Sequence, residues 1–106
     1  MFVLSGNLLF AQFSGGSKAQ IKSCINTGSI IHTAVDMGYN QIGGIIGTST
    51  NSIIENCINY GTIITNGDNY RIGGIIGADN NNQIQNCINV GIIISTSERI
   101  GGIVSP

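Results

Sequence analysis

Short apolar runs, most of them rich in isoleucine, alternate with glycines and small polar residues along the chain. The runs consist mainly of β-branched residues and are bounded by Gly, Asn, Asp, Ser and Thr, a pattern that favours strands over helices. Several runs also contain a glycine pair, such as Gly43 and Gly44, and each interior glycine would destabilise a helix by about 1 kcal/mol relative to alanine. We therefore predict an all-β chain of short strands.

One pattern occurs three times. Ile-x-Ser/Asn-Cys-Ile-Asn-x-Gly-x-Ile-Ile occupies residues 21–31, 54–64 and 84–94, and an Ile-Gly-Gly-Ile segment follows each copy. A period near thirty residues with repeated glycines is typical of stacked structural repeats, because each unit buries its apolar face only against its neighbours. The sequence therefore predicts a parallel β-helix (β-solenoid) of about three coils of roughly thirty residues each, right-handed like nearly all parallel crossover connections.

The repeat predicts one domain over residues 1–106. Residues 1–20 form a degenerate half-repeat, 21–53 a first coil, 54–83 a second and 84–106 a partial third. The alternative for the start of the chain is an export signal, but the stretch lacks a basic region and its apolar segment is interrupted by polar residues. The terminal coils have only one neighbour each and would expose isoleucine and unpaired backbone. We expect either a fragment of a longer repeat array or end-to-end self-association.

Equivalent residues of successive coils are expected to stack at the strand spacing of about 4.8 Å, which forms ladders. Asparagine is expected at a corner, where it tolerates left-handed backbone and its amide can bond to the asparagine of the next coil. The freely varying residues after it, Thr27, Tyr60 and Val90, are expected to face outward. The predicted ladders are Ile21, Ile54 and Ile84; Cys24, Cys57 and Cys87; Asn26, Asn59 and Asn89; Gly28, Gly61 and Gly91; and Ile45, Ile75 and Ile103.

The length of the repeat varies in only one half. Thirteen residues separate the second glycine of each pair from the following cysteine, whereas the other connection shortens from fifteen residues to twelve and then ten. Loops at one corner of a solenoid project together, so residues 32–41, 65–71 and 95–99 are the place to look for a partner-binding site. Solubilising surface groups are the alternative interpretation. The residues of types enriched at contact sites there are Tyr39, Tyr70, Arg71 and Arg99.

Composition excludes two classes of partner. Charged residues make up 8% of the chain and the net charge is -1, which provides no positive surface for a phosphate backbone. No apolar stretch approaches the roughly 20 residues needed to span a bilayer. We expect no nucleic-acid partner and no membrane span.

Candidate chemistry is sparse. The three cysteines occupy equivalent positions, and a linear ladder does not supply the tetrahedral ligand set of zinc, so we expect free inward-facing thiols, with one strained disulfide as the alternative. The carboxylates do not fall at equivalent positions close enough to form a catalytic pair. We predict no enzymatic activity, no catalytic residue, no metal and no cofactor. A partial match of residues 73–79 to a calcium-binding nonapeptide lacks a second carboxylate.

The segments Ile-Gly-Gly-Ile-Ile-Gly at residues 42–47 and 72–77, each preceding an Asn-Cys-Ile-Asn-x-Gly element, resemble GLUG-type glycine-rich repeats. The resemblance covers about residues 20–106. Repeats of this type occur in large bacterial and protist surface proteins, including adhesin-like proteins, and are thought to form β-solenoids without catalytic residues.

The resemblance implies a non-enzymatic structural or adhesive repeat region of a secreted or surface-displayed protein, located outside the cell or on its surface. Its partners would be adjacent repeats and a host or cell-surface protein or glycan. Two alternatives remain: a self-assembling structural β-solenoid, and the non-catalytic portion of a polysaccharide-active or protease surface enzyme.

Overall fold

The computed structural model describes residues 3–8, 16–17, 19–32, 40–66 and 70–105. Within these ranges every regular element is a β-strand. The strands are β1 (Val3–Leu8), β2 (Gly16–Ser17), β3 (Gln20–Asn26), β4 (Ile30–His32), β5 (Asn40–Gly43), β6 (Ile46–Thr50), β7 (Ile53–Glu55), β8 (Ile58–Asn59), β9 (Ile63–Thr65), β10 (Tyr70–Gly73), β11 (Ile76–Asn80), β12 (Gln83–Gln85), β13 (Ile88–Asn89), β14 (Ile93–Ser95) and β15 (Arg99–Gly101). The predicted all-β chain of short strands is confirmed.

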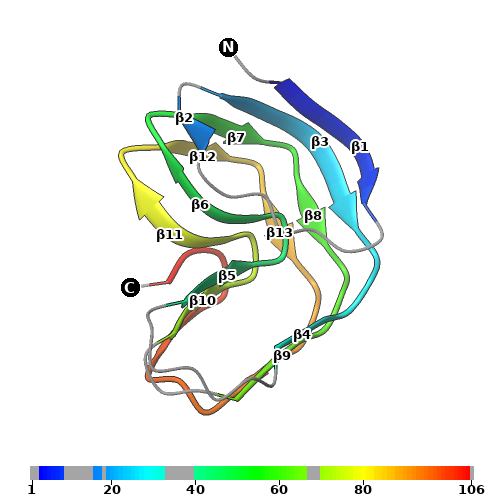
Figure 1. The fold of residues 1–106 in the computed structure, drawn as a ribbon. Coiled ribbons are helices and arrows are strands. Elements are labelled where there is room, and N and C mark those ends of the chain that lie inside the picture. The colour runs from blue at the N-terminus through cyan, green and yellow to red at the C-terminus, as the bar shows by residue number, and fades with distance from the viewer. Residues whose placement is uncertain (1–2, 9–15, 18, 33–39, 67–69, 106) are drawn as a thin grey trace.

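All pairings between these strands are parallel, and they form small sheets. Three sheets have three strands each, in the orders β15-β10-β5, β11-β6-β2 and β14-β9-β4. In the fourth sheet β1 pairs with β3, β3 pairs with both β7 and β8, and these pair with β12 and β13. Strands of successive repeats therefore lie side by side along the same path (Figure 1).

The register places equivalent residues of successive repeats opposite one another. Ile21 lies opposite Ile54 and Ile54 opposite Ile84, which are 33 and 30 residues apart. Because parallel in-register strands point equivalent side chains in the same direction, each inward position forms a row. The pairing thus converts the sequence repeat directly into a layered core.

The core consists of two clusters of buried side chains. The larger lies between the sheet of β3, β7 and β12 and the sheet of β6 and β11, and it contains Ile21, Ile54, Ile45 and Ile75, all with no exposed surface. The smaller cluster consists of Ile30, Ile42, Ile63, Tyr70 and Ile72.

The left-handed backbone lies at positions other than those expected. Within the described ranges, positive φ values of 52–60° occur at Ser23, Asn51, Asn56, Asn81 and Asn86. Three of these residues directly precede the cysteines: Asn56 and Asn86 lie between two strands, whereas Ser23 lies within β3. The expectation of left-handed backbone at Asn26, Asn59 and Asn89 is wrong, because these residues are extended and lie in β3, β8 and β13.

Glycines are required where the stacked repeats approach most closely. A Cβ atom on Gly74 would overlap the carbonyl oxygen of Gly102 and the side chain of Asn89, whereas a Cβ atom on Gly102 would meet nothing within 4 Å. The two glycines are equivalent in the repeat, and only Gly74 has a further described repeat stacked on it. The requirement for glycine therefore comes from the neighbouring repeat rather than from the local turn.

This difference predicts the outcome of two matched substitutions. Gly74→Ala should lower the free energy of unfolding by about 2–4 kcal/mol, because neither a carbonyl nor a bonded asparagine can move aside cheaply. Gly102→Ala should change it by less than about 0.5 kcal/mol. Urea unfolding of dilute protein measures both values, and equal effects of the two substitutions would contradict the stacking described here.

Candidate functional site

A row of asparagines runs through the three repeats, with Asn26 and Asn59 buried and Asn89 half-buried. The Asn26 Nδ2 atom donates to Asn59 Oδ1, and Asn59 Nδ2 donates to Asn89 Oδ1, each at 2.9 Å. Asn59 also donates to the Gly61 carbonyl at 3.0 Å and accepts from the Gly61 amide at 3.1 Å. Every polar atom of this fully buried side chain is therefore bonded within the protein. The row holds the repeats together and leaves Asn59 no capacity for a ligand.

The three cysteines form a second inward row of free thiols, with Cys24 and Cys57 buried and Cys87 half-buried. The hydrogen bond with the Cys57 thiol lowers the pKa of Cys24. The bond with Cys24 raises the pKa of Cys57 to about 11, and the bond with Cys57 together with burial raises that of Cys87. Since thiolates are the nucleophiles and metal ligands, the two raised values suit Cys57 and Cys87 to packing rather than chemistry. Among the described residues no group of His, Cys, Asp or Glu side chains could hold a metal ion.

The four residues selected from the variable connection do not form one surface. Arg71 and Arg99 lie opposite each other in β10 and β15, and both are exposed. Tyr39 lies outside the described residues. Tyr70, in contrast, has no exposed surface, so its selection as a contact residue is wrong.

Tyr70 is buried because it fills the smaller core cluster next to the variable connection. Its ring lies edge-on to that of His32, with centroids 5.2 Å apart, and its hydroxyl oxygen lies 3.5 Å from His32 Nδ1. The Ser97 hydroxyl donates to the Tyr70 carbonyl. The Tyr70 ring therefore fills a part of the core where a shorter side chain would leave a cavity.

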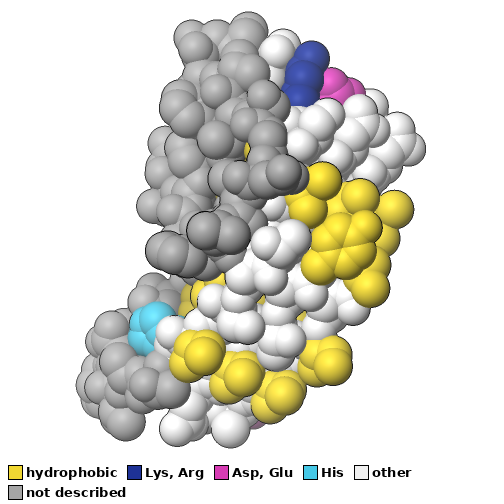
Figure 2. All heavy atoms as spheres, turned by 90° about the vertical axis from the view of Figure 1, so that its right-hand side faces the viewer, with side chains coloured by type: hydrophobic (Ala, Val, Ile, Leu, Met, Phe, Trp, Pro, Cys, Tyr) yellow, Lys and Arg dark blue, Asp and Glu magenta, His cyan; other side chains and the backbone are white. Residues whose placement is uncertain are grey.

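The structure adds an apolar outer face that the sequence analysis missed. Ile31, Ile64 and Ile94 are in register on β4, β9 and β14, and Ile31 and Ile94 expose 63% and 55% of their surface. Figure 2 shows hydrophobic side chains on the side of the molecule where β8 and β4 run, in two groups with other atoms between them. We call this set the outer apolar face; its exposed large side chains are Ile31, Tyr60, Ile88, Val90, Ile92 and Ile94.

The signal for this face was present in the isoleucine pairs. Successive strand residues point to opposite sides, so within β4 and β9 one isoleucine of each pair points outward because the other is buried. Ile30 and Ile63 are buried, and their neighbours Ile31 and Ile64 point away from the core. The expectation that Thr27, Tyr60 and Val90 face outward is confirmed, because all three are exposed.

Residues 38–64 match the family model of the GLUG motif. This segment is similar to the GLUG motif. The match confirms the resemblance noted from the sequence for these residues, and no curated protein and no solved structure matches the chain. The matched segment contains Gly43, Gly44, Asn59 and Gly61, which are positions of close contact between repeats. The match indicates a repeat domain of a larger protein.

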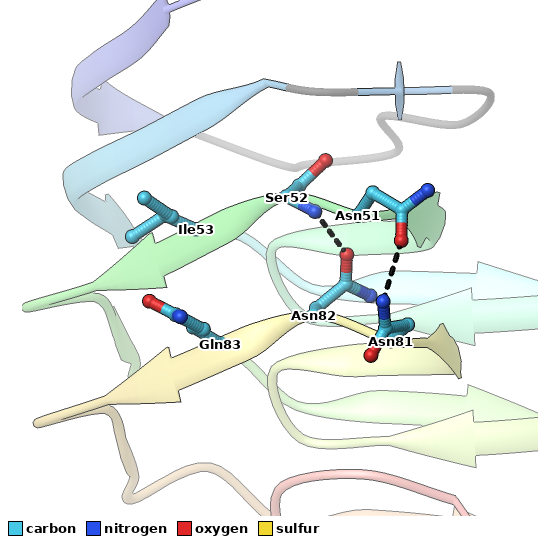
Figure 3. Close-up of a pocket in the computed structure, with 6 residues that line it drawn as sticks. All are labelled: Asn51, Ser52, Ile53, Asn81, Asn82 and Gln83. Carbon is cyan, nitrogen blue, oxygen red and sulfur yellow. Dashed lines mark hydrogen bonds between the residues drawn. The ribbon is translucent and has the colours of Figure 1, made fainter.

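A surface hollow of about 330 Å³ lies beside the start of β7 and β12. Hydrogen bonds of asparagine side chains join two successive repeats at its walls (Figure 3). Asn81 Nδ2 donates to Asn51 Oδ1 at 2.7 Å, and the Ser52 backbone amide donates to Asn82 Oδ1 at 2.8 Å. Asn82 Nδ2 also donates to the Ser49 carbonyl. The amides that line the hollow are thus bonded to one another, which marks it as a turn between repeats rather than a ligand site.

Among the described residues there is no helix long and apolar enough to cross a membrane.

The asparagine row predicts a large and position-specific loss of stability. Asn59→Ala should lower the free energy of unfolding by about 3 kcal/mol or more, since it leaves the Gly61 amide and the Asn26 amide without buried partners. Asn80→Ala, which removes an exposed side chain, should cost less than about 0.5 kcal/mol. Urea unfolding followed by circular dichroism provides both numbers, and a small effect at Asn59 would show that the row does not hold the repeats together.

The thiol row predicts how alkylation depends on pH. In the folded chain only Cys87 should react with iodoacetamide, because Cys24 and Cys57 have no exposed surface. The rate at which Cys87 is alkylated should continue to rise above pH 9.0, the ordinary thiol pKa, because folding raises the pKa of this thiol. Mass spectrometry of the digested protein identifies the modified cysteine. In guanidinium, all three should react and the rates should level off near pH 9.0; rapid native labelling of Cys57 would refute the buried row.

Proposed function

We propose that the chain is a segment of a right-handed parallel β-solenoid that acts as a non-enzymatic structural and adhesive repeat region on a surface-displayed or secreted protein. The observation that carries this proposal is the contrast between the two sides of each strand. The inward asparagine side chains are bonded from repeat to repeat, whereas the outer apolar face is exposed and repeats in register.

The solenoid architecture is supported by the pairing pattern. Each inward position is paired with its equivalent one repeat later, in parallel, in sheets that belong to different parts of the repeat. Parallel strands linked by such connections are almost always right-handed. A predominantly helical circular dichroism spectrum would overturn this part of the proposal.

A non-enzymatic role is supported by the positions and partners of the carboxylate side chains. Glu55 pairs with Lys22 at 3.2 Å, and Asp79 accepts a hydrogen bond from the amide of Asn82. Glu98 is exposed, and the remaining carboxylates, Asp36 and Asp68, lie outside the described residues. Acid-base chemistry needs a positioned acid and base at one centre, and these groups instead serve separate turns and strands.

An adhesive role is supported by the outer apolar face. Groups of exposed apolar side chains are typical of an interaction site, because their burial is favourable. Here isoleucines of three repeats lie in line at the strand spacing, which presents an extended rather than a point-like contact. The partner that fits such a surface is an apolar patch of a cell-surface protein or the apolar face of a glycan.

The test compares the two candidate contact surfaces directly. Beads coated with the chain are washed over layers of extracellular-matrix protein or mucin glycoprotein, and retained beads are counted. The variant Ile31→Thr with Ile64→Thr and Ile94→Thr removes apolar surface but keeps β-branched residues, so it should fold and should reduce retention by about tenfold. The matched variant Arg71→Ala with Arg99→Ala should retain most of it. Equal retention of all three proteins, or none by the original chain, would reject the adhesive role.

A further inference from the structure

Two of the four basic residues of the chain lie side by side on one sheet. Arg71 and Arg99 are opposite each other in the parallel strands β10 and β15, and both are exposed. Tyr70 and Ile72, the neighbours of Arg71 in β10, are buried, so the alternation of the strand directs the Arg71 side chain away from the core. Arg99 takes the same direction, because the two strands are parallel and in register.

The position of this pair does not depend on the end of the stack. β10 belongs to the middle repeat, and its other edge pairs with β5 (Figure 1). A further repeat would extend the sheet beside β15, within the plane of the sheet, and would leave the outer face of the sheet uncovered. We call the outward row of Gln41, Arg71 and Arg99 the arginine row.

Elsewhere in the chain the same register joins residues of opposite charge. Lys22 and Glu55 lie opposite each other in β3 and β7, and the Lys22 Nζ atom forms an ion pair with Glu55 Oε1 at 3.2 Å. In the arginine row two like charges occupy this relation, which disfavours the pairing of the strands as long as nothing neutralises them. The stacking of the repeats therefore holds together two charges that a bound anion would stabilise.

No carboxylate of the described residues neutralises the two guanidinium groups. Glu55 and Asp79 are bonded to other residues, and Glu98 directly precedes Arg99 without forming an ion pair with it. The remaining carboxylates of the chain lie outside the described residues. Within the part of the chain that the structure describes, the side-chain N–H donors of Arg71 and Arg99 are thus left to solvent or to a ligand.

Guanidinium groups bind oxyanions more strongly than neutral donors do. The planar N–H fork of arginine matches two oxygens of one oxyanion, and such charge-assisted hydrogen bonds are roughly twice as strong as neutral ones. A tetrahedral dianion has four oxygens and two charges, so it accepts from both arginines and neutralises both at once. A chloride ion or a single carboxylate would leave one of the two positive charges in place.

We propose that Arg71 and Arg99 form a binding site for a doubly charged tetrahedral oxyanion, sulfate or phosphate, that bridges the second and third repeats. The oxyanion is either a free ion or an ester group of a larger molecule. Because the site is exposed and its charges are screened by salt, we expect a dissociation constant in the millimolar range. The site lies on a different sheet from the outer apolar face, so it goes beyond the adhesive role and does not rest on it.

The test is a nuclear magnetic resonance titration of the full, isotope-labelled chain. Arg71 and Arg99 are the only arginines of the chain, so the two side-chain Nε–H signals report on the site directly. Sodium sulfate replaces sodium chloride at constant ionic strength, which separates binding from screening. Both signals should shift with the same saturable midpoint.

A matched pair of variants tests whether the two arginines act together. Arg71→Gln should raise the midpoint read from the Arg99 signal at least about fivefold, because one of the two forks is lost. The control Lys22→Gln removes the same charge from another sheet and should leave the midpoint unchanged. The backbone amide signals recorded in the same spectra show that each variant is folded.

The ester sodium methyl sulfate distinguishes the two sources of the oxyanion. A site for the free dianion should bind this singly charged ester at least about fivefold more weakly than sulfate, whereas a site for an ester group should bind both comparably.

Shifts that never saturate, or an unchanged midpoint in Arg71→Gln, would overturn the shared site and leave two independently solvated charges. Equal weakening by Lys22→Gln would overturn it as well, because net charge would then explain the binding. None of these outcomes depends on bead retention, so this inference and the adhesive role fail independently.

Discussion

The structure depends on the stacking of identical side chains at the spacing of hydrogen-bonded parallel strands. At that spacing an asparagine amide can reach the amide of the next repeat, as Asn59 does in both directions at 2.9 Å. The glycines follow from the same constraint, because the close approach that forms the asparagine bonds leaves no volume for a Cβ atom at Gly74. The isoleucine rows fill what remains of the interior and contribute the burial that favours folding. The spacing of the stacked strands therefore accounts for the recurrence of Asn, Gly and Ile together.

This constraint separates the residues available for function from those that are not. A side chain that is bonded above and below cannot change without affecting both neighbours, so inward positions repeat. Outward side chains are not constrained in this way. The residue that follows the stacked asparagine differs between repeats and is Thr27, Tyr60 or Val90. Thr27, Tyr60 and Val90 are therefore among the exposed residues that differ between repeats without loss of the fold.

The sequence repeat was enough to predict the strand content, the identity of stacked residues and the outward position of Tyr60. It failed at Tyr70, because a tyrosine next to a variable connection looks like a contact residue until the width of the core beside it is known. It also misplaced the left-handed backbone, since asparagine tolerates that conformation at Asn56 and a buried extended position at Asn59 equally well. Residue type alone cannot distinguish a turn asparagine from a stacked one; the hydrogen-bond partners decide it.

The same comparison explains why the ends of the stack behave differently from its middle. Gly74 and Gly102, and likewise Asn59 and Asn89, occupy equivalent positions of the repeat, yet one member of each pair is enclosed and the other is not. In a stacked repeat protein the stability of a unit is mainly the energy of its two interfaces, so a terminal unit has about half of the contacts that its sequence can make. Ile84 and Asn89 are the same residue types as their buried equivalents Ile54 and Asn59, and β12 and β13 contain no charged residue. The last described repeat therefore has the composition of an interior repeat.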